Sequence, residues 1–568
     1  MKPEAINTAT TLRRGSITCE QSSRLSLAIS LGAILAFVLA ITLPFSNQAL
    51  HIDDAIFWDF AKTNLESPFQ QHINNYNLVG EETAQWRDTH PPLTQTYLAG
   101  VMYLTGSDSE SPLHLAFIIF PMITGVSMFF LARRFTSNAL LATMLLLGTP
   151  VIMTLSHTLM ADVPMLAFWL VAAATYIYGV DRNDWRLLAL AGVFSMLAVM
   201  TGYQALALCP LFLLYAWLNG RLNLKTALPA AAPLFALFAL ALVSFTIYGT
   251  LPRLSHVRGL SVAGTNVIKR AEGILVQLGG ASVFPVFIIG FLCLRRRRYL
   301  ALLPVMAFVI ILGLSHFNDG FTLMSTILFI IFMGAGSFAL FAISSEIVIQ
   351  SMNALKKMPI DRDFLFLGSW VLMMAAAVII MLPHTPAKYT LPILAPLVLI
   401  LVRETESGVK SEKTARTIIT TCLVLTLVVA NAVSVADYQL ARSYREFAFD
   451  LNQNYETSGT VWFIGEWGFR HYMESQGYRY LTSTNDQVAE GDLVVKPQFG
   501  GWPLAETVTS RMKLLDSTET DWSFPVRVMS PESNAGFYGS YWGMLPYSIT
   551  DAPLERFAVY RIGPSADQ

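Results

Sequence analysis

Three short segments combine ionisable residues in patterns that could support proton transfer or ligand binding. They are the pair Asp53-Asp54, the run from Arg87 to Pro92, which contains His90, and Asp162 in an Ala-Asp-Val-Pro sequence. Two neighbouring carboxylates push their pKa values apart, so one can remain basic while the other holds a proton. The segments therefore provide candidate proton acceptors and cations.

Each segment also has a purely structural explanation. Asp53 or Asp54 could cap a helix, because apolar residues at helical spacing follow them, although one cap needs only one Asp. Thr89 could cap a helix that starts at Pro91. Asp162 could face water in the headgroup layer, but an ionisable residue at membrane depth is by default a functional candidate.

The elements that must position these residues are membrane helices. The 568-residue chain is 54% hydrophobic and only 14% charged, whereas soluble domains carry about 25% charged residues. Thirteen apolar runs of roughly spanning length lie between residues 25 and 436. The sequence therefore predicts a polytopic α-helical membrane protein with about 13 spans.

The charge pattern predicts three parts and an orientation. We expect a cytoplasmic N-terminal segment at 1–24, a transmembrane domain at 25–436 with a long outer loop at 45–113, and a small soluble α/β domain at 437–568. The basic residues of the membrane part cluster in alternate loops, and the positive-inside rule then places the N-terminus in the cytoplasm and the C-terminal domain outside. The C-terminal segment holds 10 basic and 17 acidic residues, which excludes a nucleic-acid partner.

One outer loop, residues 250–275, departs from this charge pattern. It carries four candidate anion-binding residues, Arg253, Arg258, Lys269 and Arg270. A basic cluster on the outer face calls for an anionic partner, and a lipid phosphate would serve. Attraction to acidic lipid headgroups is the alternative explanation.

The order of these motifs resembles a known family. An Asp pair soon after the first span, His90-Pro-Pro-Leu before a short apolar helix, and Ala-Asp162-x-Pro between the third and fourth spans are similar to the GT-C glycosyltransferase superfamily, specifically its protein O-mannosyltransferase and aminoarabinose-transferase-like group. The resemblance covers about residues 25–215 and extends weakly to Lys388-Tyr389-Thr-Leu-Pro. Two features differ: Asp54 stands where Glu is common, and the C-terminal segment matches no acceptor-recognition domain.

The resemblance implies a hexosyl or pentosyl transferase that moves a sugar from a polyprenyl-phosphate donor to a protein, lipid or glycan acceptor at the outer face. It assigns Asp53 as general base, with Asp54 beside it and Asp162 orienting the acceptor. Arg87, His90, Lys388 and Tyr389 would bind substrate or the leaving phosphate.

Cofactor and location are also expectations at this point. A divalent metal ion held by Asp53, Asp54, His90 and Asp162 and a metal-free carboxylate pair are both open. We expect an integral protein of the bacterial inner (plasma) membrane, in contact with lipid, whose C-terminal domain is periplasmic or extracellular. The alternatives are a transporter or flippase of lipid-linked sugars and a noncatalytic glycan-assembly protein.

Overall fold

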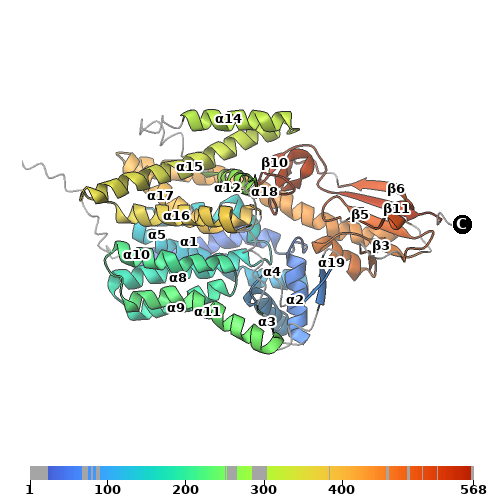
Figure 1. Ribbon diagram of the computed structural model, residues 1–568, viewed down its shortest axis with the longest axis horizontal. Coiled ribbons are helices and arrows are strands. Elements are labelled where there is room, and N and C mark those ends of the chain that lie inside the picture. The colour runs from blue at the N-terminus through green and yellow to red at the C-terminus, as the bar shows by residue number, and fades with distance from the viewer. Residues whose placement is uncertain are drawn as a thin grey trace, which may run out of the picture.

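The computed structural model describes residues 24–66, 75–78, 81–84, 90–249, 251, 265–284, 303–382, 384–455, 459–482, 487–501, 503–520 and 522–564. These residues form a bundle of long helices joined to a smaller α/β domain at the C-terminal end (Figure 1). Arg87, Arg253 and Arg258 lie outside the described residues.

The helical bundle is built from the apolar runs of the sequence, because a buried or lipid-facing backbone must satisfy its own hydrogen bonds. Its main helices are α1 (Arg24–Thr42), α5 (Ile119–Phe135), α6 (Ala139–Leu147), α7 (Pro150–Leu155), α8 (Asp162–Arg182), α9 (Trp185–Val199), α10 (Leu208–Leu218), α11 (Leu224–Tyr248), α12 (Thr265–Ser282), α14 (Leu303–Asn318), α15 (Leu323–Leu355), α16 (Arg362–Met381), α17 (Leu391–Gly408) and α18 (Glu412–Asn454). Within the described ranges, seven helical stretches are long and apolar enough to cross a membrane. The polytopic helical fold is confirmed, and the number of thirteen spans stays a prediction.

The long segment after α1 is partly helical, as predicted. It contains η1 (Leu43–Phe45), α2 (Asp54–Glu66), the antiparallel pair β1 (Asn75–Leu78) and β2 (Glu81–Ala84), α3 (Leu93–Thr105) and α4 (Glu110–Phe117). The helix α2 starts directly at the Asp pair and buries Phe57 and Phe60, so its apolar stripe packs inward. The pair Asp53-Asp54 therefore lies at the N-terminal end of a helix anchored in the core.

The C-terminal domain is a small α/β fold. Its five-stranded sheet has the order β4-β3-β5-β11-β6, with β3 parallel to β4 and β5, and β11 antiparallel to β5 and β6. The strands are β3 (Val461–Phe463), β4 (Arg479–Tyr480), β5 (Leu493–Pro497), β6 (Met512–Glu519) and β11 (Arg556–Ile562), with the helices α19 (Trp467–Ser475) and α20 (Glu506–Thr509). The small α/β domain expected from the sequence is confirmed.

A second lobe of this domain lies over the membrane part. It contains β7 (Val526–Arg527), β8 (Met529–Ser530), η7 (Pro531–Ser533), β9 (Ala535–Gly536) and β10 (Ser548–Ile549). Ser325 at the start of α15 donates to Ser533 O at 2.7 Å, and Ala387 N donates to Phe537 O at 2.9 Å. The long helix α18 passes through the boundary expected at residue 437 and connects the two parts without a linker.

Close backbone contacts also fix α19 on the loop before α2. Leu50 N donates to the Tyr472 hydroxyl at 2.7 Å. A Cβ on Gly468 would lie 1.9 Å from Leu50 O, so only glycine permits this approach. The C-terminal domain therefore contacts the residues immediately before Asp53.

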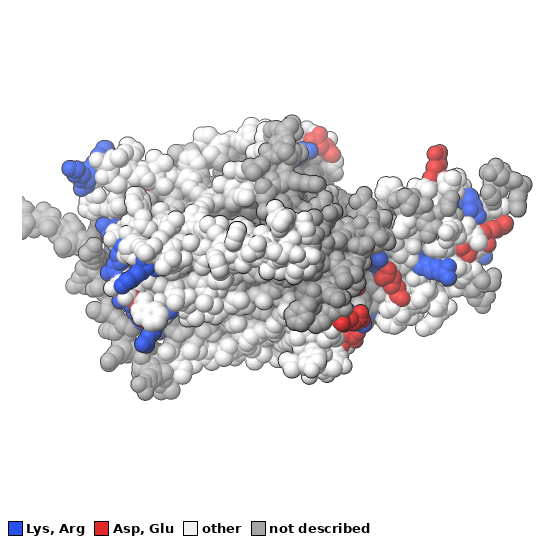
Figure 2. All heavy atoms as spheres, turned by 60° about the horizontal axis from the view of Figure 1, so that its bottom comes forward, with Lys and Arg blue, Asp and Glu red and all other residues white. Residues whose placement is uncertain are grey.

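Basic side chains are unevenly distributed along the bundle. Lys and Arg side chains gather at the end of the bundle away from the C-terminal domain (Figure 2). A cavity of about 2240 Å³ reaches this end and is lined by Arg133, Arg182 and Arg403, among others. Arg134, also in its lining, pairs with Asp181 at 2.6 Å and with Asp363 at 3.0 Å. The predicted site residues lie outside this lining, so this cavity is separate from them.

Candidate active site

Three of the predicted site residues meet at one point. The Lys388 ammonium lies 2.9 Å from Asp53 Oδ2 and 3.9 Å from Asp162 Oδ2. The side chains keep 11%, 20% and 14% of their surface exposed, for Lys388, Asp53 and Asp162 respectively. The structure therefore joins residues that are far apart in the sequence into a partly accessible cluster of one cation and two carboxylates.

Each member is held by a different element. The Asp53 carbonyl accepts the amides of Ile56 and Phe57 at the start of α2, while its carboxylate is directed to Lys388. Asp162 is the first residue of α8. Lys388 lies in the short helix η6 (Ala387–Thr390), whose first amide is bonded to the C-terminal domain. The cluster consequently depends on the contact between the two parts of the chain.

The surroundings favour the charged form of both partners. Burial opposes ionisation of Asp53, but the Lys388 ammonium, with His90 and His384 nearby, lowers its pKa below the usual range. Burial likewise opposes the charge of Lys388, and Asp53 and then Asp162 raise its pKa. As long as Lys388 stays in place, Asp53 is an ionised but weakly basic carboxylate.

Of the other predicted site residues, some lie near the cluster of Asp53, Asp162 and Lys388 and some lie far from it. The His90 ring packs on Phe57 with centroids 5.0 Å apart, on the side of Asp53. Tyr389 is buried next to Lys388. Arg270 is buried and donates to Leu382 O at 2.7 Å, whereas Lys269 is exposed on α12. His90 and Tyr389 thus join the cluster, and Arg270 supports the end of α16.

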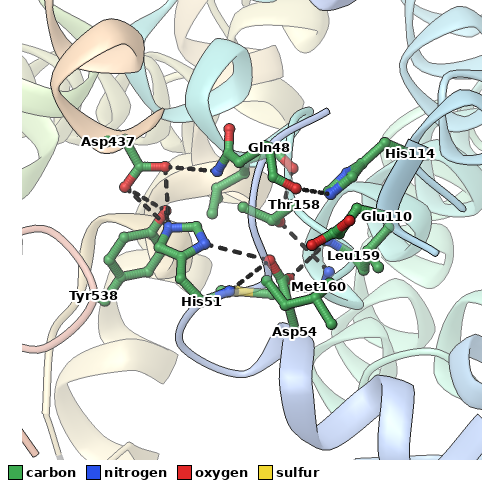
Figure 3. A network of polar contacts seen from close by, with 12 residues as sticks. Gln48, His51, Asp54, Glu110, His114, Thr158, Leu159, Met160, Asp437 and Tyr538 are labelled. Atoms are coloured by element: carbon green, nitrogen blue, oxygen red, sulfur yellow. Dashed lines mark hydrogen bonds and ion pairs between the residues drawn. The ribbon is translucent and has the colours of Figure 1, made fainter. Parts of the chain in front are cut away.

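Asp54 belongs to a separate, buried polar network that includes His51 and Leu159 (Figure 3). Its Oδ1 accepts the amide of Leu159 at 2.7 Å, and its Oδ2 lies 3.3 Å from His51 Nδ1. Both side chains are fully buried. Asp53 and Asp54 are adjacent in sequence but have different environments. The Asp53 carboxylate lies in the partly accessible cluster, whereas the Asp54 carboxylate is buried and binds the backbone amide of Leu159.

His51 links Asp54 to the far end of the chain. Its Nε2 lies 3.1 Å from Asp437 Oδ2, and the Tyr538 hydroxyl donates to Asp437 Oδ1 at 2.9 Å (Figure 3). Gln48 also donates to Asp437, at 3.2 Å. Burial opposes the imidazolium charge, yet Asp437 and then Asp54 raise the pKa of His51 to about 10. His51 is accordingly a buried cation between two carboxylates.

The backbone between His51 and Asp53 is strained. Ile52 has a φ of 47°, a conformation that a β-branched residue rarely adopts. Such strain costs on the order of 1–3 kcal/mol and persists only where the surroundings impose it. The contacts of His51 on one side and of Asp54 on the other impose it here, and they direct the Asp53 carboxylate toward Lys388.

Sequence reasoning did not find His51, Asp437 or Tyr538. His51 directly precedes the Asp pair, but it is 386 residues from Asp437, and no local pattern relates the two. Asp437 offered a weak signal, because it follows an apolar run that reads as a span and ionisable residues at such positions often have a partner.

The residues around Asp53 do not fit a divalent ion in this arrangement. The described part of the chain holds no group of three or more His, Cys, Asp or Glu side chains placed to bind a metal. The position between Asp53 and Asp162 is taken by the Lys388 ammonium, which already supplies positive charge to both carboxylates. We therefore derive no step through a metal.

Solved structures of membrane glycosyltransferases resemble this chain at low identity. They include the archaeal oligosaccharyltransferase AglB from Archaeoglobus fulgidus in complex with an inhibitory peptide and a dolichol-phosphate (13% identity, TM-score 0.48, covering 81% of this chain and 64% of that chain). They also include ArnT from Cupriavidus metallidurans bound to undecaprenyl phosphate (10% identity, TM-score 0.39, covering 83% of this chain and 93% of that chain). A third is the S. cerevisiae protein O-mannosyltransferase Pmt1-Pmt2 complex bound to the sugar donor (18% identity, TM-score 0.31, covering 39% of this chain and 33% of that chain). The chain thus spans slightly less than two thirds of the length of the oligosaccharyltransferase it matches.

Sequence comparisons give a more local result. No curated protein matches the sequence significantly. The family model described as dolichyl-phosphate-mannose-protein mannosyltransferase matches residues 89–248, the region that contains His90 and Asp162. This match confirms the resemblance drawn from the motifs for one region of the chain: residues 89–248 carry the sequence pattern of the dolichyl-phosphate-mannose-protein mannosyltransferase family.

Proposed function

We propose that the protein transfers a sugar from a polyprenyl-phosphate donor to an acceptor hydroxyl at the outer face of the membrane. The observation that carries the proposal is the Lys388 ammonium between Asp53 and Asp162, at the junction of the helical bundle with the C-terminal domain. Such a transfer needs a base for the acceptor and a cation for the leaving phosphate, and this cluster provides both. The family pattern at residues 89–248 supports the same reaction class.

In the proposed reaction the acceptor oxygen attacks the anomeric carbon of the donor. The new bond from that oxygen to the sugar forms as the bond from the sugar to the phosphate oxygen breaks. The acceptor proton passes to the Asp53 carboxylate, and the electron pair of the broken bond leaves on the polyprenyl phosphate. A single displacement of this kind inverts the anomeric configuration, and Asp162 orients the acceptor.

Lys388 has two partners in this scheme. In the present arrangement it is paired with Asp53 and lowers the basicity of that carboxylate. An arriving donor phosphate would compete for the ammonium, and withdrawal of Lys388 from Asp53 would let the pKa of the carboxyl rise toward a more basic value. Asp53 would then be most basic only when the donor is bound, so the site without donor would not deprotonate an acceptor.

His51 acts on this reaction as a positioning residue. It is fully buried and holds Asp54 and Asp437 on either side, so it has no route to substrate. Its role in the proposal is to keep the strained turn at Ile52 and thus the direction of the Asp53 carboxylate. His90, next to Asp53, completes the phosphate side together with Arg87, which lies outside the described residues.

The orientation belongs to the same proposal. The arginines at the far end of the bundle support a cytoplasmic N-terminus and a C-terminal domain on the opposite side, as the positive-inside rule expects. The transporter alternative would place ionisable residues midway along the bundle, whereas Asp53, Asp162 and Lys388 lie at helix ends. A bacterial inner membrane remains the expected location.

The test is mass spectrometry of lipids that copurify with the protein in mild detergent. We expect a polyprenyl-phosphate-linked sugar with the wild type and at least tenfold less with Lys388→Met, because the variant lacks the cation for the phosphate. Lys388→Arg, which keeps the charge, should retain the lipid. Lys356→Met, at the C-terminal end of α15 and outside the predicted site, should also retain it. Equal lipid in Lys388→Met and wild type, with unchanged elution profiles, would remove Lys388 from the phosphate site. Absence of any such lipid from the wild type would count against the donor itself.

A further inference from the structure

A row of aromatic rings extends from the cluster onto the C-terminal domain. Tyr389, beside Lys388, lies 5.7 Å from the His384 ring, and His384 lies 5.4 Å from Tyr541. Tyr541 is 4.1 Å from Trp542, which is 5.2 Å from Trp467 (all distances between ring centroids). We call these five residues the aromatic strip. It begins at the proposed site and ends at the start of α19.

The strip differs from the other aromatic residues of the domain. Tyr472 and Tyr538 are buried and donate to Glu110 and Asp437, at 2.8 Å and 2.9 Å. Tyr541, in contrast, is 64% exposed. Packing and hydrogen bonding explain the buried tyrosines, but they do not explain a largely exposed ring placed between His384 and Trp542.

The local backbone is shaped to hold these rings. Trp467 has a φ of 60°, a left-handed conformation that costs a non-glycine residue about 1 kcal/mol or more. Its ring packs against Gly500, where a Cβ would come within 2.8 Å. A Cβ on Gly539 would lie 2.8 Å from the Tyr541 ring and 2.9 Å from the Trp542 ring. The positive φ of Trp467 and the absence of a side chain at Gly500 and Gly539 therefore allow the rings of the strip to pack together.

The strip is also connected to the proposed site. Thr385 N, next to His384, donates to Ser540 Oγ at 3.1 Å, which ties the loop bearing Tyr541 to the segment bearing Lys388. Only the ring of His384 separates Tyr541 from Tyr389, the neighbour of Lys388. A molecule resting on Tyr541 would extend toward Asp53.

The chemistry of the strip indicates what that molecule is. The face of an aromatic ring is electron-rich, and it packs well on the polarised C–H face of a pyranose while the sugar hydroxyls stay in water. The lipid chain of the donor must remain with the helical bundle, so a platform on the C-terminal domain is available to the other substrate. We propose that the aromatic strip is the acceptor subsite and that the acceptor is a saccharide.

This inference rests on the proposed function and narrows it, because it chooses a glycan over a protein or lipid hydroxyl. The competing role for exposed Tyr and Trp near a membrane is insertion into the interface. The two roles separate experimentally, since a saccharide subsite must bind sugars in detergent solution, where no bilayer is present.

The test measures binding of the purified full-length protein in detergent to an array of oligosaccharides that covers neutral, acidic and amino sugars. We expect the wild type to bind at least one class, and Tyr541→Ala to bind it about tenfold more weakly, as loss of one aromatic contact predicts. Tyr541→Phe keeps the ring face and should bind nearly normally. Phe524→Ala, at another exposed aromatic position of the same lobe, should be unchanged.

Three results would overturn the inference. The first is the absence of saccharide binding by the wild type, and the second is equal binding by Tyr541→Ala and wild type. The third is a measurable decrease in the quenching of tryptophan fluorescence by brominated lipids in liposomes when Trp542 is replaced by Phe, which would assign the strip to the membrane instead. The proposed function is judged separately, by the copurifying donor lipid, which Tyr541→Ala should retain in full.

Discussion

Replacement of His51 by Gln tests whether a buried charge holds the proposed base in place. Gln has a similar length and can still donate a hydrogen bond, but it cannot carry a positive charge. In the variant, the carboxylates of Asp54 and Asp437 would remain fully buried without the cation between them. Breaking a buried ion pair by removing one partner costs about 3–5 kcal/mol, a large part of the roughly 5–15 kcal/mol that stabilises a folded domain.

The pKa of His51 gives a second estimate of the same quantity. A rise from 6.5 to about 10 corresponds to about 5 kcal/mol of preferential stabilisation of the charged form. Because the pKa in the folded state is the higher one, this stability is fully present below pH 6.5, and it is lost as the pH rises through about 10. The wild type should therefore lose stability between these values, and His51→Gln should show a flatter dependence.

The assay is thermal unfolding of the detergent-solubilised protein across this pH range, followed by tryptophan fluorescence. We expect a clearly lower midpoint for His51→Gln at pH 7 and a smaller difference between variant and wild type at pH 10. His471→Gln is the control, since the pKa of this His is lowered, chiefly by burial, and its neutral ring has no stabilising charge to lose at neutral pH. An unchanged midpoint for His51→Gln at every pH would refute the buried cation.

Two further predictions concern the contact between the domains and the topology. Gly468→Ala should separate α19 from the loop before α2, because its Cβ would lie 1.9 Å from Leu50 O. Faster limited proteolysis of the C-terminal domain would detect this separation. The control is Gly477→Ala, which has open space around the added Cβ but a positive φ, so it tests the effect of backbone strain alone. Reporter fusions after Glu446 should give extracytoplasmic signals and fusions after Arg298 cytoplasmic ones; the reverse result would place Asp53 on the wrong side for an outer-face transferase.

Most of the fold could be predicted because its signals are local. Apolar runs long enough to span a bilayer predict α1, α8 and α15, and short apolar runs are typical of strands such as β3 and β5. Each of these elements can be recognised from its own residues, without knowing which distant residues it contacts in the folded chain. The length of α18 was not predicted, because its polar second half, after Asp437, reads as the start of a separate domain.

The site could be predicted only in part. Asp53, Asp162 and Lys388 were selected from motifs, and the structure brings them together. Their roles stay predictions. The different environments of Asp53 and Asp54 could not be foreseen, because they depend on the turn at Ile52 and on a contact between His51 and Asp437 that only the folded chain creates.

The most direct test of the account is sugar transfer by Asp53→Asn. Asn keeps the size of the side chain but cannot accept the acceptor proton, so proteoliposomes loaded with the copurified polyprenyl-phosphate sugar should transfer it about 10²- to 10⁴-fold more slowly than wild type. The variant should keep the wild-type elution profile and bound lipid, and Asp59→Asn, on the exposed face of α2, should transfer normally. Wild-type transfer rates in Asp53→Asn would contradict the central claim that this carboxylate is the base.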